Sequence, residues 1–147
     1  MQDLRWFAMR NIPDFKLKIL EKFFAAQSDV AAAYLFGSYG TEYEHPKSDL
    51  DLGLVFRGKQ KLERELQIET ELSLLLKTDK IDFVNLNLAP VALQFRVLSE
   101  GLLIYERDYI LNSNFIECVL REYRDYSFHY TRFAAESRRA LWKEYPL

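Results

Sequence analysis

The chain has 147 residues and a formal net charge of −2, and 49% of its residues are hydrophobic. This length and apolar content suit one compact domain with a sizeable core. Lys and Arg (20) nearly balance Asp and Glu (22), which excludes an overall basic field of the kind that draws proteins to nucleic acid. The single cysteine excludes an internal disulfide. No apolar run approaches a membrane span of about 20 residues, and the N-terminus lacks signal-peptide features, so we expect a cytoplasmic protein.

The first part of the chain predicts one helix and two strands. Pro13 opens a segment with apolar residues at helical spacing, which predicts a helix over residues 14–26. The apolar run over residues 30–36 has strand length and ends abruptly at Gly37. After a polar, turn-rich stretch the polarity alternates, which predicts a second strand. One face of that strand holds Leu50, Leu52, Leu54 and Phe56, and the other holds Asp49, Asp51, Gly53 and Val55.

The remainder predicts alternating helices and strands. A helical period over residues 61–76 precedes strand-like residues 80–87. Pro90 opens a helix that ends with Gly101 in a C′ position, and residues 102–106 are a fourth strand. From residue 108 to about 142 we predict helix, in which Ser127 marks a candidate break. This order defines an α/β (α+β) domain with a small sheet.

Three features in this order indicate a phosphate site lined by carboxylates. Gly37 permits close backbone approach at the end of the first strand, and Ser38 offers a hydroxyl and an N–H. Asp49 and Asp51 share one face of the second strand, with Cβ atoms about 7 Å apart. Asp82 belongs to the third strand. If the second and third strands pair, all three carboxylates converge.

Crowded carboxylates raise one another's pKa, and a divalent cation removes that cost. Mg²⁺ prefers oxygen ligands and completes its shell with water and substrate phosphate. The three aspartates therefore suggest metal-dependent phosphoryl or nucleotidyl transfer, with Gly37 and Ser38 holding the phosphate tail. Each feature alone is common in turns and solvated strands, and only their combination and spacing are specific.

The segment GSYGTEYEHPKSDLDLGL resembles the G-S-x10-D-x-D signature of the nucleotidyltransferase superfamily, in its minimal nucleotidyltransferase (MNT) branch. The resemblance implies the polymerase-beta-like fold, a small mixed sheet flanked by helices. It implies that Asp49 and Asp51 hold two Mg²⁺ ions with the triphosphate. It makes Asp82 the third carboxylate, which helps one metal and activates the acceptor hydroxyl, and it assigns Gly37 and Ser38 to the terminal phosphates. The implied reaction is attack of a hydroxyl on the α-phosphate of a nucleoside triphosphate, with release of pyrophosphate.

The chain departs from this branch after the serine. Many members carry Ala-Arg-Gly there, whereas this chain has Gly40-Thr41-Glu42, so one basic residue that could neutralise phosphate is missing. Lys47 is a candidate substitute, although a charged loop residue is more often merely solvated. We interpret His45 as a loop residue without a chemical role.

Small MNT proteins of this length resemble the antitoxins of HEPN/MNT toxin–antitoxin pairs. That resemblance implies transfer of AMP from ATP to a tyrosine of a HEPN ribonuclease toxin, and a complex of the two proteins. Two alternatives stay open: a small-molecule nucleotidyltransferase of the aminoglycoside type, and an antitoxin that acts by binding alone. The balanced charge disfavours direct nucleic-acid binding.

We expect residues 1–106 to form the MNT domain and residues 107–147 to form a helical extension packed on it. The first half of the extension is expected to pack on the core. Its later aromatic residues, with Arg138, Arg139 and Trp142, are candidates for a partner surface because tyrosine, tryptophan and arginine are enriched at interfaces. Arg124 and His129 match the R-x4-H motif of HEPN ribonucleases. That family needs about four helices around the motif, so we interpret both residues as structural or interfacial.

Overall fold

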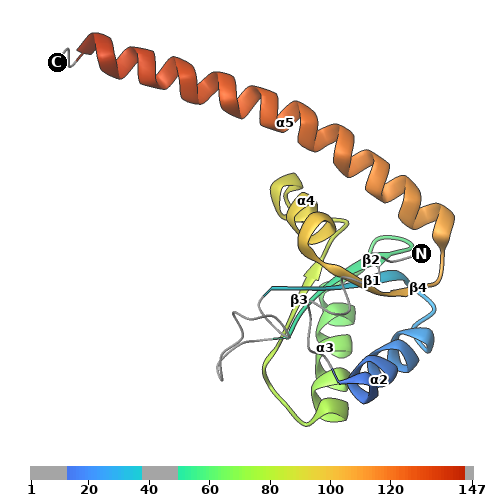
Figure 1. The fold of residues 1–147 in the computed structure, drawn as a ribbon. Coiled ribbons are helices and arrows are strands. Elements are labelled where there is room, and N and C mark those ends of the chain that lie inside the picture. The colour runs from blue at the N-terminus through green and yellow to red at the C-terminus, as the bar shows by residue number, and fades with distance from the viewer. Residues whose placement is uncertain (1–12, 38–49, 145–147) are drawn as a thin grey trace.

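Residues 13–37 and 50–144 are described by a computed structural model of the chain, with side chains up to residue 140 (Figure 1). The elements in chain order are α2 (Asp14–Ala25), β1 (Val30–Phe36), β2 (Leu50–Phe56), α3 (Leu62–Leu76), β3 (Ile81–Asn85), α4 (Val91–Glu100), β4 (Leu102–Glu106) and α5 (Tyr109–Glu144). This order confirms the predicted α/β class.

Two details differ from the sequence prediction. α5 continues through Ser127 without a break, because the backbone stays helical there. Tyr126 and Tyr130 accordingly lie one turn apart, with ring centroids 6.1 Å from each other. Gly101 ends α4 in an extended conformation (φ −82°) rather than a left-handed one. The glycine is required for space, because a Cβ at this position would overlap the carbonyl oxygen of Val97.

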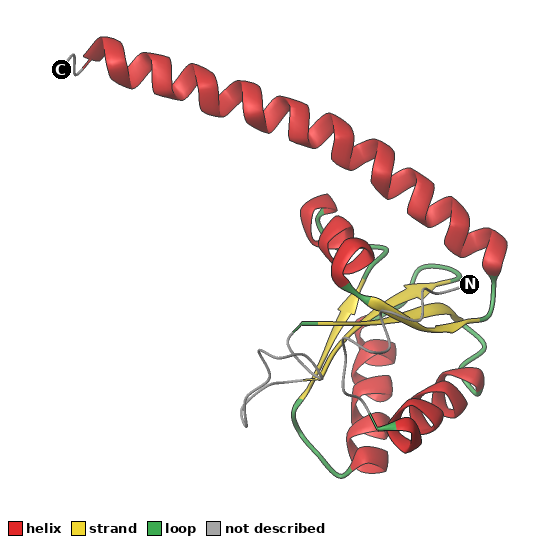
Figure 2. Cartoon of the chain, viewed as in Figure 1, coloured by secondary structure: helices red, strands yellow, loops and turns green. Residues whose placement is uncertain are grey.

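The four strands of the described residues form one mixed sheet in the order β3-β2-β1-β4 (Figure 2). β1 is antiparallel to both β2 and β4, whereas β2 and β3 are parallel. α2 and α3 cover one face of this sheet, and α4 and the first part of α5 cover the other (Figure 1). Figure 1 also shows that the second half of α5 extends beyond both α4 and the sheet.

The alternation of β2 separates two apolar cores, as the sequence predicts. On one face Leu52 and Leu54 pack with Phe24 of α2 and with Ile68 and Leu72 of α3. The other face holds a second core, whose members include Tyr34, Phe36, Val55, Leu86 and Val97, flanked by Leu111 and Phe115 of α5. Burying one such leucine or phenylalanine contributes about 1.5–3 kcal/mol. The two cores therefore fix which face each residue of β2 presents.

A buried polar chain anchors the start of α5 to the sheet. The hydroxyl of Tyr34 donates to Asn112 Oδ1 (2.9 Å), and Asn112 Nδ2 donates to Glu106 Oε2 (2.7 Å). Asn112 has no exposed surface. Burial raises the pKa of Tyr34 to about 12, so its phenol remains a donor at neutral pH.

Arg64 joins α3 to the turn between α2 and β1. Its guanidinium donates to both carboxylate oxygens of Asp29, each at 2.8 Å, and to Gln27 Oε1 at 2.7 Å. These hydrogen bonds hold the pKa of Asp29 below its usual value. Of the helices in the described part of the chain, none is long and apolar enough to cross a membrane.

Candidate active site

The sheet topology brings three chain segments to one edge. Because β1 runs antiparallel to β2, the end of β1 lies beside the beginning of β2. Because β3 runs parallel to β2, it begins at that same edge. The amide of Leu50 donates to the carbonyl of Lys80 at 2.9 Å, which fixes the two beginnings to each other. The pairing that the sequence argument required is therefore present.

Asp51 and Asp82 are register partners on the parallel strands β2 and β3. Neighbouring strands lie about 4.8 Å apart, so the two carboxylates leave adjacent backbone positions. Both side chains belong to the sheet face that α4 covers, because Val55 and Val84, at even spacing along the same strands, contact the core under α4. Asp51 is half-buried and Asp82 is exposed. A substrate can therefore reach the pair from solvent.

The backbone of Gly37 lies in close contact with the side chain of Asp51. Gly37 directly follows Phe36, the register partner of Asp51 across the antiparallel pair, and it has a φ of +76°. A Cβ built on Gly37 would overlap Oδ2 of Asp51 and come within 3.1 Å of its Cγ. Only glycine combines this backbone conformation with this close approach. The strand end therefore depends on Gly37 for both reasons.

The other predicted site residues fall outside the described residues. Ser38 directly follows Gly37 and Asp49 directly precedes Leu50 in the sequence, but neither is described by the structure. Gly40, Thr41, Glu42, His45 and Lys47 also lie in that range. Within the described residues, no group of three or more His, Cys, Asp and Glu side chains could hold a metal ion. The described part of the chain contributes the pair Asp51 and Asp82.

The chemistry of this pair suits a divalent cation. Two carboxylates on neighbouring strands repel each other, and a cation between them relieves that repulsion. Mg²⁺ takes oxygen ligands and is commonly bound through one or two carboxylates together with substrate phosphate. The two carboxylates therefore fit Mg²⁺ that is also bound by a substrate phosphate.

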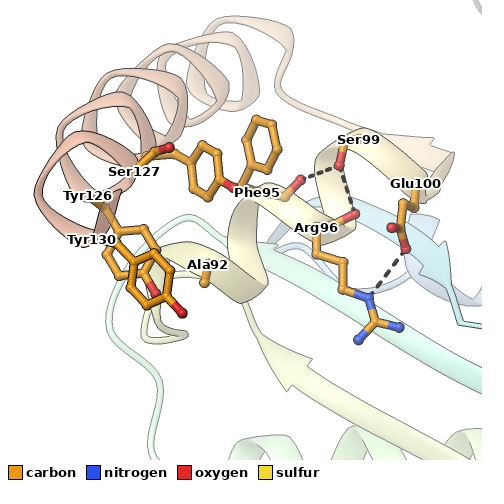
Figure 3. A pocket seen from close by; sticks show the side chains of 9 residues that line it. Ala92, Phe95, Arg96, Ser99, Glu100, Tyr126, Ser127 and Tyr130 are labelled. Carbon is orange, nitrogen blue, oxygen red and sulfur yellow. Dashed lines mark hydrogen bonds and ion pairs between the residues drawn. The ribbon is translucent and has the colours of Figure 1, made fainter. Parts of the chain in front are cut away.

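Sequence reasoning missed a groove between α4 and α5, with a volume of about 380 Å³ (Figure 3). Phe95 of α4 stacks face to face on Tyr123 of α5, with ring centroids 3.7 Å apart and planes within 2°. Tyr126 and Tyr130 continue this row of rings along α5. The aromatic residues of the C-terminal segment indicate that α5 could line a binding surface. Nothing in the sequence indicates that α4 lines the other side of this groove. The full lining is Ala92, Phe95, Arg96, Ser99, Glu100, Tyr123, Tyr126, Ser127 and Tyr130.

Arg124 and His129 lie on the exposed surface of α5. Their separation of five residues places them about 140° apart around a helix with 3.6 residues per turn. The Arg124 side chain lies 3.8 Å from Asp125, and the His129 ring packs edge-on against Phe128. A single helix therefore does not bring the two side chains to one point.

This chain belongs to the polymerase beta, nucleotidyltransferase family: the family model matches residues 18–110, which is more than half of the chain. The family expected from the sequence is thereby confirmed. A comparison with curated protein sequences finds no match.

Solved structures with the same fold come from toxin–antitoxin systems. One is a toxin–antitoxin with AMP-PNP, at a TM-score of 0.70 and 18% identity, covering 83% of this chain and 98% of that chain. Another is a tri-AMPylated Shewanella oneidensis HEPN toxin in complex with MNT antitoxin, at a TM-score of 0.67 and 17% identity, covering 85% and 98%. A third is the toxin–antitoxin MntA–HepT, at a TM-score of 0.67 and 16% identity, covering 86% and 99%. At these identities the likeness establishes the fold.

Proposed function

We propose that this protein is an MNT antitoxin that transfers AMP from ATP to a tyrosine hydroxyl of a HEPN toxin and thereby neutralises it. Family membership supports nucleotidyl transfer. The fold is shared with structures that contain AMP-PNP and an AMPylated HEPN toxin, which supports ATP as the donor and a protein as the acceptor. Because ATP is the proposed substrate, we expect the reaction to take place in the cytoplasm.

The observation that carries the proposal is the register pairing of Asp51 with Asp82 beside Gly37. In the proposed site Asp49 and Asp51 hold two Mg²⁺ ions, and Asp82 supplies the third carboxylate. When bound, Mg²⁺ stabilises charge on the attacking and leaving oxygens of such a displacement. Gly37 and Ser38 hold the terminal phosphates, where the absence of a side chain on Gly37 lets the backbone approach closely.

Asp82 is proposed to take the proton from the acceptor. The tyrosine oxygen forms a bond to the α-phosphorus while the bond between that phosphorus and the pyrophosphate oxygen breaks. The exposure of Asp82 suits this role, because a general base must come within hydrogen-bonding reach of an incoming hydroxyl. Residues 1–106 carry this chemistry in the proposal, and residues 107–147 form the extension.

Intact mass spectrometry of both chains, after incubation with ATP and Mg²⁺ and with the cognate HEPN protein, tests the proposal. We expect the HEPN chain to gain the mass of one or more AMP groups, and Asp82→Asn to abolish the gain. Asp79→Asn is the matched control, because Asp79 is an exposed aspartate three residues away that the proposal does not use.

The other outcomes separate the alternatives. A tight complex without any gain in mass would replace the proposal with neutralisation by binding alone. Transfer of AMP to a small hydroxylated molecule such as an aminoglycoside, with no complex and no transfer to the HEPN protein, would establish the small-molecule enzyme.

A further inference from the structure

The groove between α4 and α5 lies on the same side of the sheet as the carboxylate pair, and it is lined by the side of α4 that faces away from the sheet. Val55 of β2 lies on the same face as Asp51, and it packs in the core beneath α4 and α5. A molecule held in the groove is therefore on the same side of the protein as Asp51 and Asp82, with α4 between it and the sheet. Figure 3 shows Tyr126 and Tyr130 of α5 beside Ala92 of α4, with the Arg96–Glu100 ion pair further along α4.

The length of α5 carries its aromatic row past the body of the protein. α5 begins after β4, at the edge of the sheet opposite the carboxylate pair, because β4 is antiparallel to β1. Its 36 residues span about 54 Å, against about 23 Å for the seven residues of β1. Figure 1 shows α5 running back over the sheet toward the end of β1 and continuing beyond it.

The side chains along this part of α5 become more exposed toward its C-terminal half. Val119 is buried and Tyr123 is half-buried against Phe95. Further along, Tyr130 is 61% exposed and Phe133 is 68% exposed. Exposed aromatic rings in a row are typical of protein-binding surfaces, where tyrosine and arginine supply most of the binding energy. We use the name aromatic groove for the groove residues Ala92, Phe95, Tyr126 and Tyr130 together with Phe133, the next exposed ring along α5.

The charge around the aromatic groove indicates what kind of partner it fits. Residues 126–140 carry Arg132, Arg138 and Arg139 against the single acid Glu136, whereas the whole chain has a net charge of −2. A second copy of this chain would bring two such arginine-rich segments together, which is electrostatically unfavourable. A protein surface with an apolar ridge flanked by acidic residues complements both the rings and the arginines.

We propose that the aromatic groove and the arginines of residues 126–140 are the docking surface for the protein acceptor, whose contacting surface is an acidic-flanked apolar ridge. This inference rests on the proposed function for the identity of the acceptor. The surface binds the acceptor on the same side of the sheet as Asp51 and Asp82 and takes no part in the transfer itself. Recognition and transfer are thereby assigned to different side chains.

Titration calorimetry with the purified cognate HEPN protein tests the docking surface. We expect Tyr130→Ser combined with Phe133→Ser to raise the Kd at least tenfold, since central aromatic residues dominate interface energetics. Arg138→Glu combined with Arg139→Glu should also raise the Kd and should reduce its dependence on salt. Leu74→Ser is the control, because Leu74 is 74% exposed on α3, on the opposite side of the sheet. All of these side chains are exposed, so thermal unfolding should stay close to that of the unsubstituted protein.

The outcomes distinguish this inference from the proposed function. An unchanged Kd in Tyr130→Ser/Phe133→Ser, while the unsubstituted protein transfers AMP, overturns the docking surface and leaves the transfer chemistry standing. Loss of binding in that variant, with no AMP transfer by the unsubstituted protein, supports the docking surface and overturns the transfer. Light scattering that shows a dimer of this chain, converted to a monomer by the same substitutions, assigns the groove to a second copy and overturns the inference.

Discussion

The carboxylate of Asp51 lies in the space that a side chain on Gly37 would fill. This relationship joins the glycine of the G-S step to the second aspartate of D-x-D across an antiparallel strand pair. Fourteen sequence positions separate the two residues, and the sheet makes them direct neighbours. The spacing of the motif is therefore a consequence of strand pairing.

Gly37→Ala is expected to lower AMP transfer more than it lowers stability. The new methyl group meets Asp51, and φ of +76° is unfavourable for alanine by about 1 kcal/mol. Displacing the Asp51 carboxylate should reduce the transfer rate at least tenfold, measured by incorporation of labelled AMP. Gly58→Ala is the matched control, because a Cβ at Gly58 meets no atom within 4 Å. Equal transfer rates in the two variants would contradict the role of Gly37.

Chelation of divalent cations should abolish AMP transfer and leave the fold intact. Both apolar cores are built from hydrophobic side chains and contain no metal ligand among the described residues. Circular dichroism in EDTA should therefore keep its helical signal, while labelled AMP incorporation stops and returns when Mg²⁺ is added. Loss of the helical signal in EDTA would show instead that the cation holds the fold.

Tyr34→Phe should lower the free energy of unfolding by about 1–3 kcal/mol, because it leaves the fully buried Asn112 without its donor. Tyr109→Phe is the control, since Tyr109 is 71% exposed. Chemical denaturation at neutral pH measures both variants. A loss no larger in Tyr34→Phe than in Tyr109→Phe would contradict the anchor.

The same tyrosine predicts an alkaline loss of stability. Its pKa is about 12 in the fold and about 10 when unfolded, so the folded state binds the proton more tightly. The resulting stabilisation is complete below pH 10 and is lost as the pH rises toward 12. The difference in stability between the unsubstituted protein and Tyr34→Phe should therefore shrink over this range.

Arg64→Met should destabilise the protein by about 1–3 kcal/mol, since two charge-assisted hydrogen bonds to Asp29 are lost. Arg121→Met should change stability by less than about 0.5 kcal/mol, because its ion pair with Glu117 is a solvent-exposed pair on one helix. The pKa of Asp29 is lowered by Arg64, so the stabilisation is full above the ordinary value of 3.8. It should disappear as the pH falls through the lowered pKa, which acid denaturation of both proteins measures.

The strands and helices follow from the sequence because their apolar periods are regular and their boundaries carry proline or glycine. The face of Asp51 follows too, since alternation along β2 places it opposite Leu50 and Leu52. The proximity of Asp51 to Asp82 could be predicted only on the condition that β2 and β3 pair, because sequence periodicity carries no information on strand order. The aromatic groove could not be predicted from the sequence for a related reason. In the sequence Phe95 is an ordinary apolar residue of the α4 segment, and only the fold shows that it stacks on Tyr123.

The parallel pairing of β2 with β3 also has a consequence for how the protein matures. Parallel strands cannot be joined by a tight turn, and α3 provides the crossover between them. Asp51 and Asp82 therefore become neighbours only after the intervening chain has formed α3 and packed it on the sheet, a step with a large loop-closure entropy. The proposed transfer activity therefore requires the parallel pairing of β2 with β3.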